Sequence, residues 1–254
     1  ASGEITWVRQ ARFGDIWNGS CENLDPVNCP DDNGPDYDYG AGPVIALDSQ
    51  GRRVILAGDK GGVVAALDAA NGDVLWKNKV GRGGVVAGIN FGLAAHDGKV
   101  FVPVSDVPDG RNYDEPARPG LYALNIDTGD YVWKAPAEQD VCEGRPGCYP
   151  GYSAAISVTD DYVLAGSNEG YLRAFDLRTG TVLWEFDTTQ SFLAVDGRQA
   201  SGGSIGGGQA PLVVGDRIIL NSGYAFAGKM PGNALLVLRP KQEPQSTLTL
   251  SSER

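Results

Sequence analysis

The segment Ala174–Trp184 reads AFDLRTGTVLW, and its order of alanine, polar residue, glycine turn and tryptophan occurs three times in the chain. The other copies are Ala66–Trp76, ALDAANGDVLW, and Ala123–Trp133, ALNIDTGDYVW, with the same spacing from alanine to tryptophan. A motif that returns after about 50 residues indicates a repeat architecture. The identity of the repeat therefore decides the fold.

Each repeat is predicted to contain four strands. In the first, β-branched and apolar runs are separated by turns such as Lys60-Gly61-Gly62 and Ala70-Asn71-Gly72. No window has the 3.6-residue periodicity of a helical solenoid, whereas four strands per repeat are typical of a β-propeller. We therefore predict an all-β propeller of four-stranded antiparallel blades, in which each repeated tryptophan packs between neighbouring blades.

The repeats place about four blades in a partial propeller that spans residues 1–240. Residues 1–10 keep the Gly-to-Trp spacing in Gly3–Trp7 and are predicted to be the last strand of a preceding blade. The polar residues 241–254 are predicted to be a C-terminal tail. Because an open stack would leave unpaired faces, we expect missing blades, or a second copy, to complete a ring of about eight. The blades are predicted at residues 42–80, 88–135, 152–188 and 203–238.

Composition agrees with this fold and excludes several functions. The 254 residues include 36 Gly and 15 Pro, as expected for many short strands joined by tight turns. A net charge of −11 argues against binding of nucleic acid. No apolar run approaches the roughly 20 residues of a membrane-spanning helix. The single histidine, His96, makes a Ser-His-Asp or Cys-His mechanism improbable.

The four cysteines form two local pairs, Cys21/Cys29 and Cys142/Cys148, within loops rich in Gly and Pro. Their spacings differ from those of zinc and redox sites. Two disulfides, Cys21–Cys29 and Cys142–Cys148, are therefore predicted, and they favour an oxidising compartment such as the periplasm, or secretion.

The repeated motif resembles the tryptophan-docking motif of the eight-bladed quinoprotein alcohol dehydrogenases, and the chain corresponds to the C-terminal half of that ring. The polyvinyl alcohol dehydrogenase branch is nearest in pattern. The resemblance implies pyrroloquinoline quinone and calcium as cofactors, with the main calcium ligands outside this chain. The stretches that carry the resemblance are Gly14–Asn18, Gly34–Ala41, Gly81–Gly84, Gly202–Gly206 and Asn221–Asn233.

Asp38 lies in Tyr37-Asp38-Tyr39, ahead of the first strand of a blade. The resemblance implies that such an aspartate is the catalytic base, and it is also a candidate calcium ligand. A carboxylate suits this role, because alcohol oxidation requires a base for the hydroxyl proton. The alternative is that Asp38 only caps a turn in an acidic loop.

Lys60 lies in the turn Gly58–Gly62, where the family has a cation that contacts the quinone oxygens. A fixed positive charge there would stabilise the negative charge that develops during reduction. The alternative is an ordinary exposed lysine of a turn.

Five further cofactor contacts are implied by position in the family pattern. Tyr152 and Met230 stand where relatives have tryptophan. Tyr152 is a different aromatic residue, whereas Met230 is not aromatic. Asp106 precedes a Pro- and Gly-rich insertion at residues 106–119 and has the alternative role of a turn cap. The five residues are Ser105, Asp106, Tyr152, Gly228 and Met230.

These features predict a quinoprotein that oxidises a secondary or polymeric alcohol to a ketone and passes electrons to a cytochrome c. Two alternatives are retained. A non-catalytic propeller that binds a protein partner would not need Asp38 and Lys60 together. A propeller hydrolase or lyase is disfavoured because no paired-carboxylate pattern is visible and histidine occurs once.

Overall fold

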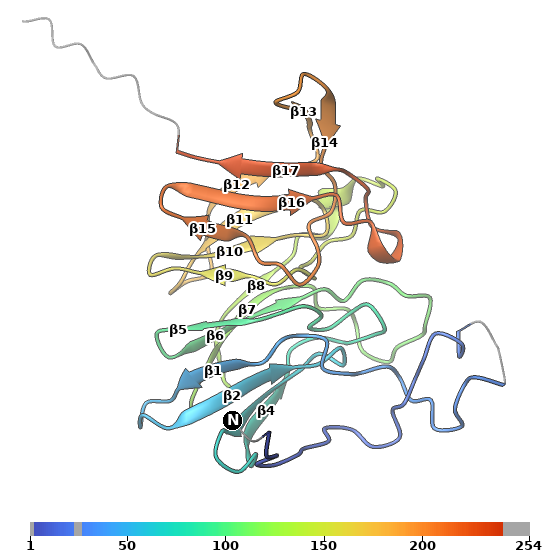
Figure 1. Cartoon of the computed structure of the whole chain (residues 1–254), viewed down its shortest axis with the longest axis vertical. Helices are drawn as coiled ribbons and strands as arrows, with labels where there is room; N and C mark the ends of the chain where they lie inside the picture. The colour runs from blue at the N-terminus through green and yellow to red at the C-terminus, as the bar shows by residue number, and fades with distance from the viewer. Residues whose placement is uncertain (1–2, 23–26, 241–254) are drawn as a thin grey trace, which may run out of the picture.

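The structure, a computed structural model, describes residues 3–22 and 27–240. Its sheets are antiparallel, and strands adjacent in sequence are also adjacent in each sheet. This meander order is the one expected when short turns join successive strands. We call the sheets blades 1 to 4 in chain order, and they are stacked along the long axis of the molecule (Figure 1).

Blades 1 to 3 each have four strands. Blade 1 contains β1 (Val44–Leu47), β2 (Arg53–Gly58), β3 (Val63–Asp68) and β4 (Val74–Lys79). Blade 2 contains β5 (Ala94–His96), β6 (Lys99–Val104), β7 (Gly120–Asn125) and β8 (Tyr131–Pro136). Blade 3 contains β9 (Ser157–Val158), β10 (Tyr162–Gly166), β11 (Tyr171–Asp176) and β12 (Val182–Asp187).

Blade 4 differs from the others, since it has three strands among the described residues: β15 (Leu212–Val214), β16 (Arg217–Ser222) and β17 (Ala234–Leu238). A separate hairpin, β13 (Ser191–Leu193) with β14 (Gln199–Ser201), precedes it and projects from the stack (Figure 1). The sequence did not predict this hairpin. The tail predicted at residues 241–254 lies outside the described residues.

The first strands of the blades lie side by side. Gly42, just before β1, forms a parallel bridge with Gly92, just before β5. A Cβ atom at Gly92 would lie 2.8 Å from the Cβ of Ala155, so the third blade is equally close. Glycine permits this approach of backbones. The prediction of an all-β propeller is confirmed by this radial arrangement of antiparallel sheets.

The core consists of layers between blades, and β6 shows how the sequence builds them. Successive side chains of a strand point to opposite faces of its sheet. Val100, Val102 and Val104 pack in a cluster shared with blade 1. Phe101 packs in the cluster shared with blade 3. A run that is apolar at consecutive positions is therefore buried on both faces.

The repeated tryptophans join each blade to the next. The indole N–H of Trp76 donates a hydrogen bond to the carbonyl of Ile126 (2.7 Å), and the indole N–H of Trp133 donates to that of Leu177 (3.1 Å). The ring of Trp76 lies over Gly129, where a Cβ atom would be 2.5 Å from the ring, and Gly129 has a φ of 76°. The turn thus requires glycine for both its conformation and its contact.

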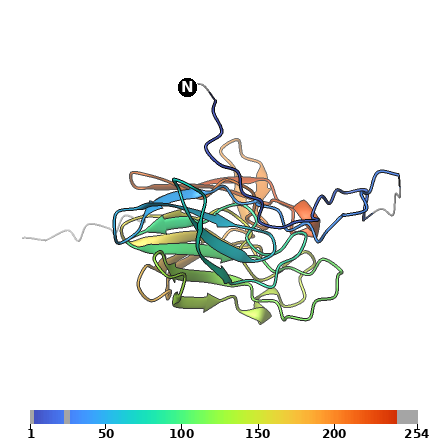
Figure 2. The same ribbon diagram turned by 90° about the horizontal axis from the view of Figure 1, so that it is seen from below.

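Trp7 occupies the equivalent place on blade 1, because its indole N–H donates to the carbonyl of Ala69 (3.1 Å). Residues 3–10, predicted as a last strand, are nevertheless not part of any strand. A strand needs a neighbour for its backbone groups, and none is present beside this segment among the described residues. The segment that precedes β1 instead extends beyond the sheets on one side (Figures 1 and 2).

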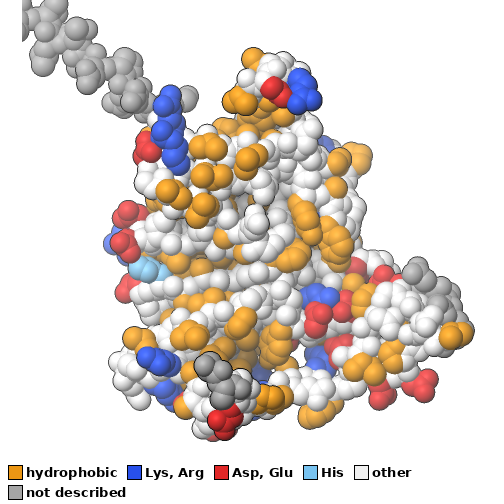
Figure 3. Space-filling model, in the orientation of Figure 1, with side chains coloured by type: hydrophobic (Ala, Val, Ile, Leu, Met, Phe, Trp, Pro, Cys, Tyr) orange, Lys and Arg blue, Asp and Glu red, His pale blue; other side chains and the backbone are white. Residues whose placement is uncertain are grey.

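Trp184, in the third copy of the motif, is 40% exposed. It stacks on Phe186, with ring centroids 6.1 Å apart. Hydrophobic side chains also show at the surface over blade 4 (Figure 3), where Leu235 is 69% and Val237 57% exposed. No helix of the described residues is long and apolar enough to cross a membrane.

Candidate functional site

A pocket of about 320 Å³ lies where four parts of the chain meet. They are the loop before β1, the turn between β2 and β3, residues 85–91 and the segment after β16. Its polar lining is formed by Asp36, Asp38, Lys60, Asn90 and Lys229. Its aromatic lining is formed by Trp17, Phe91, Tyr224 and Phe226.

Lys60 lies between two carboxylates in this pocket. Its ammonium donates a hydrogen bond to Asp36 Oδ2 at 2.7 Å and lies 3.1 Å from Asp38 Oδ1. The backbone N–H of Lys60 donates to the carbonyl of Asp38 (3.0 Å), and its own carbonyl accepts from Gly84 (3.1 Å). The structure therefore brings the two principal predicted residues, Asp38 and Lys60, into contact.

The loop that carries the carboxylates is held by Asp15. Its two carboxylate oxygens accept the backbone N–H groups of Asp36 and Tyr37, each at 2.9 Å. Asp36 has a φ of 67°, a conformation that an aspartate adopts more readily than most residues. The ring of Tyr37 packs on Gly61, where a Cβ atom would lie 2.7 Å away. These contacts fix the Asp-Tyr-Asp segment against the turn of Lys60.

The two carboxylates have different surroundings. Asp36 is buried, and burial raises its pKa even though Lys60 opposes the shift. The side chain of Asp38 is 66% exposed and is the one that solvent reaches. The site thus has one carboxylate that anchors the lysine and one that is accessible.

Lys229 is the second cation of the pocket. It is 4% exposed, and burial lowers its pKa to about 8. It follows the short 3-10 turn η2 (Phe226–Gly228).

A larger hollow, of about 730 Å³, is lined by Trp184, Phe186, Ile218 and other residues of the outer strands. It contains none of the predicted site residues and has the exposed tryptophan as one wall. We therefore place the functional site in the smaller pocket, where charged groups converge.

Asp106 was predicted to contact the cofactor, but its carboxylate is used within the protein. It accepts backbone N–H groups from Arg82 (2.6 Å), Gly83 (3.1 Å), Gly88 (3.0 Å) and Arg118 (2.8 Å). Asp106 is 2% exposed. Its carboxylate joins the Gly-rich loop to the insertion at residues 106–119 and does not line the pocket.

Ser105 and Tyr152 are also buried away from the pocket. The Ser105 hydroxyl donates to the carbonyl of Val86 (3.4 Å) and accepts from Asn168 Nδ2 (3.3 Å). The Tyr152 hydroxyl accepts a hydrogen bond from Arg173 (3.1 Å), and burial raises the pKa of Tyr152. Both residues serve the packing of blades 2 and 3.

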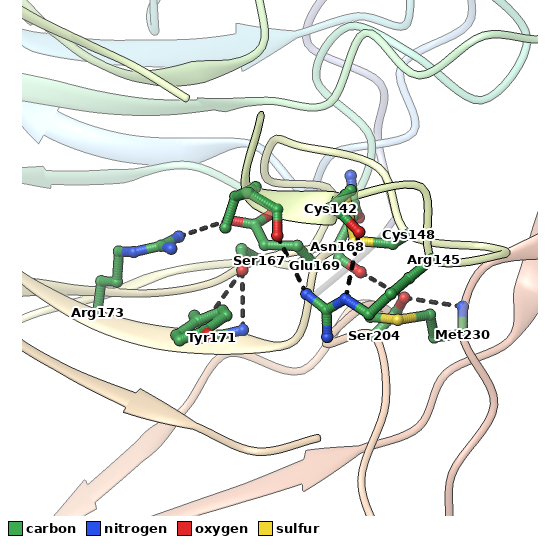
Figure 4. Close-up of a disulfide and its surroundings, with 11 residues drawn as sticks. Cys142, Arg145, Cys148, Ser167, Asn168, Glu169, Tyr171, Arg173, Ser204 and Met230 are labelled. Carbon is green, nitrogen blue, oxygen red and sulfur yellow. Dashed lines mark hydrogen bonds and ion pairs between the residues drawn. A yellow bond between two sulfur atoms is a disulfide. The ribbon is translucent and has the colours of Figure 1, made fainter. Parts of the chain in front are cut away.

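Gly228 and Met230 flank Lys229 but do not line the pocket themselves. Both predicted disulfides are present. Met230 packs against the Cys142–Cys148 disulfide, whose first cysteine is the last residue of η1 (Gln139–Cys142). The N–H of Met230 donates to Ser204 Oγ at 3.0 Å (Figure 4). The disulfide loop therefore holds the segment that carries the second cation.

Several pocket residues were missed by sequence reasoning. Asp36 stands two positions before Asp38, which was a usable signal. Lys229 stands between two residues that were predicted. No group of three or more His, Cys, Asp or Glu side chains suited to a metal occurs in residues 3–22 and 27–240, so calcium binding by Asp38 stays a prediction.

Residues 40–242 match the PQQ_2 family, which is described as outer membrane protein assembly factor BamB. A polyvinylalcohol dehydrogenase from a Pseudomonas species is 36% identical over 236 residues, covering 92% of this chain and 36% of the relative. Another from Sphingopyxis sp. (strain 113P3) is 36% identical over 230 residues, covering 88% and 35%. The chain spans about a third of the length of these relatives.

A solved structure, the quinohemoprotein alcohol dehydrogenase from Comamonas testosteroni, has a TM-score of 0.58 and 15% identity, covering 86% of this chain and 41% of that protein. At this identity the likeness concerns the fold alone. It agrees with the propeller seen in the blades.

Proposed function

The chain belongs to the PQQ_2 family, and from this premise we propose that its pocket forms part of the quinone site of an alcohol dehydrogenase. The relatives named polyvinylalcohol dehydrogenase support the reaction class. The observation that carries the proposal is the Lys60 ammonium held between Asp36 and Asp38 in an aromatic-lined pocket.

The residues present fit pyrroloquinoline quinone, which is planar, aromatic and carries carboxylates. Lys60 and Lys229 provide positive charge, and Phe91 and Tyr224 provide aromatic surface, with ring centroids 6.1 Å apart. When bound, the quinone would accept the electron pair removed from the alcohol carbon. Cations fixed in a partly buried pocket interact more strongly with a developing anion than they would in water.

Asp38 and Asp36 would have different roles in the reaction. Asp38 would accept the hydroxyl proton of the alcohol, because its carboxylate is accessible and unprotonated carboxylates act as general bases. Asp36 would hold Lys60 in place, since it is buried and makes the shorter contact, 2.7 Å. Asp38 is also the proposed contributor to calcium binding, together with ligands outside the described residues.

We further propose that the substrate is a secondary or polymeric alcohol, that the product is a ketone and that a cytochrome c receives the electrons. The two disulfides favour the periplasm or secretion. Additional blades, or a second copy, would complete the ring to about eight. These statements concern the whole protein of which the chain forms part.

The test uses the full polypeptide, loaded with pyrroloquinoline quinone and calcium, and measures dye reduction with secondary alcohols. Asp38→Asn is expected to lower turnover by about 100- to 10,000-fold while quinone binding is kept. Asp32→Asn, at an exposed carboxylate of the same loop, is the matched control and should be active. Full turnover in Asp38→Asn would exclude Asp38 as the base.

A non-catalytic scaffold is the second candidate, favoured by the description of the matching family. Absence of quinone binding by the full polypeptide, with the fold intact by circular dichroism, would favour this alternative. Saturable quinone binding would oppose it.

A further inference from the structure

The ammonium of Lys229 is not paired with either carboxylate that lines the pocket, since Asp36 and Asp38 both contact Lys60. Lys229 is 4% exposed, and within residues 3–22 and 27–240 we find no hydrogen bond or ion pair to its side chain. Buried charged groups are normally paired, because removing a charge from water costs free energy. Lys60, in the same pocket, follows this rule with two carboxylates. Lys229 does not.

The backbone on either side of Lys229 packs against the Cys142–Cys148 loop, which fixes the point from which the side chain extends. Met230 packs on the Cys142–Cys148 disulfide. A Cβ atom at Gly147 would lie 2.8 Å from the carbonyl oxygen of Gly228 and 3.1 Å from the carbonyl carbon of Lys229. The disulfide loop is therefore in close contact with this backbone and fixes its position.

None of the charged groups around Lys229 in the described part of the chain forms an ion pair with its ammonium. Asp36 and Asp38 are engaged by Lys60. On the disulfide loop, the Arg145 guanidinium is directed to the carbonyls of Cys142 and Val141. Glu143, on the same loop, is exposed. Burial alone lowers the pKa of Lys229, with no contribution from a charged neighbour.

We propose that Lys229 is an anion-binding residue that receives a carboxylate carried by an aromatic ring, with Tyr224 and Phe226 as the apolar wall beside it. Tyr224 contacts Phe91 (6.1 Å between centroids) and Phe226 (6.0 Å) and gives the ring a surface on which to lie. The inference rests on the proposed function, because the quinone would be the natural carrier of that carboxylate.

The affinity of the pocket for an anion at Lys229 should depend on pH. An anion at Lys229 favours the charged amine, so binding raises its pKa above about 8. At pH 8 about half of the free protein must then take up a proton on binding. The affinity is constant below this pH and falls as the pH rises above it. The other titratable groups that line the pocket are Asp36, Asp38, Lys60 and Tyr224.

The experiment is calorimetric titration of the full polypeptide with pyrroloquinoline quinone and, separately, with benzene-1,3,5-tricarboxylate, in two buffers of different ionisation enthalpy at pH 8. The wild type is expected to take up about half a proton. Lys229→Gln should lower the affinity by about 10- to 100-fold and abolish the uptake. Lys134→Gln, at a solvent-exposed lysine of β8, is the control and should match the wild type.

The outcomes separate this inference from the proposed function. Binding of the tricarboxylate alone, dependent on Lys229, would retain the inference and reject the quinone. Equal quinone affinity in the wild type and Lys229→Gln, without proton uptake, would overturn the inference and retain the quinone site. Failure of both ligands to bind would overturn it as well. Should Lys229→Gln not fold, proton uptake by the wild type decides.

Discussion

At the scale of the residue, the pocket contains two lysines with different surroundings: one is paired with carboxylates and, among the described residues, the other is not. Lys60 is accompanied by Asp36 and Asp38, at 2.7 and 3.1 Å. Lys229 is nearly inaccessible, and its pKa is lowered to about 8 because burial disfavours its charge. An unpaired charge of this kind reduces the stability of the fold and is typical of residues kept for binding.

Lys229→Met is therefore expected to stabilise the fold at neutral pH. The pKa of Lys229 in the folded protein, about 8, lies below the ordinary value of 10.5. The charged amine therefore lowers the unfolding free energy by its full amount below pH 8, and this loss disappears above pH 10.5. Its size is about 3 kcal/mol. Urea denaturation of both proteins should show a large difference at pH 7 and a small one at pH 10. A variant that is no more stable at pH 7 would contradict the burial of an unpaired charge.

Some residues of the site could be predicted from the sequence and others could not. Asp38 and Lys60 each belong to a local pattern, and the structure places them together. Asp106 has a structural role that its local sequence does not show, since its carboxylate accepts N–H groups from residues up to 24 positions away. Lys229 was missed although its neighbours Gly228 and Met230 were predicted, because the local sequence does not show which of the three side chains lines the pocket. Side-chain direction depends on such distant contacts, which no short motif encodes.

At the scale of the element, the repeated motif builds the same junction in each blade. The pairing register shifts at Ala66/Leu67, at Ala123/Leu124 and at Ala174/Phe175, in each case just before the glycine turn. A bulge of this kind bends a strand and increases its twist. Because the turn and the tryptophan are local features, the sequence alone was enough to predict an all-β propeller of antiparallel blades, although blade 4 has three strands among the described residues where four were predicted. Hairpin β13–β14, outside the motif, was not foreseen.

Gly129→Ala tests the junction. Gly129 and Gly51 have the same φ of 76°, so alanine is strained equally at both. Only Gly129 lies against a ring, since a Cβ atom there would be 2.5 Å from Trp76, whereas nothing lies within 4 Å at Gly51. We expect Gly51→Ala to cost about 1 kcal/mol of unfolding free energy and Gly129→Ala about 1–3 kcal/mol more. Equal losses would show that the ring contact is not stabilising.

At the scale of the whole molecule, the core becomes smaller towards blade 4. The cluster between blades 1 and 2 includes Val54, Leu56 and many other residues, whereas the one between blades 3 and 4 is formed by Ala154, Leu172, Ile205 and Leu220. In repeat proteins each unit is stabilised chiefly by its neighbours. Stability should therefore vary along the stack.

Hydrogen exchange would measure this gradient. Amides of β6 and β7, which have nearly all their side chains buried, should exchange on the order of 100-fold more slowly than those of β15 and β16. The comparison is internal, so the same sample provides its own control. Uniform protection across all four blades would mean that the stack unfolds as one unit.

In each docked pair, the tryptophan comes earlier in the chain than the carbonyl that accepts its hydrogen bond. Trp7 is sealed by a carbonyl 62 residues further along, Trp76 by one 50 residues further and Trp133 by one 44 residues further. Each indole therefore donates its hydrogen bond to a turn that lies further towards the C-terminus and is synthesised later. Synthesis from the N-terminus therefore produces each tryptophan before the turn against which it docks, so burial of the indole requires that the next blade has been made.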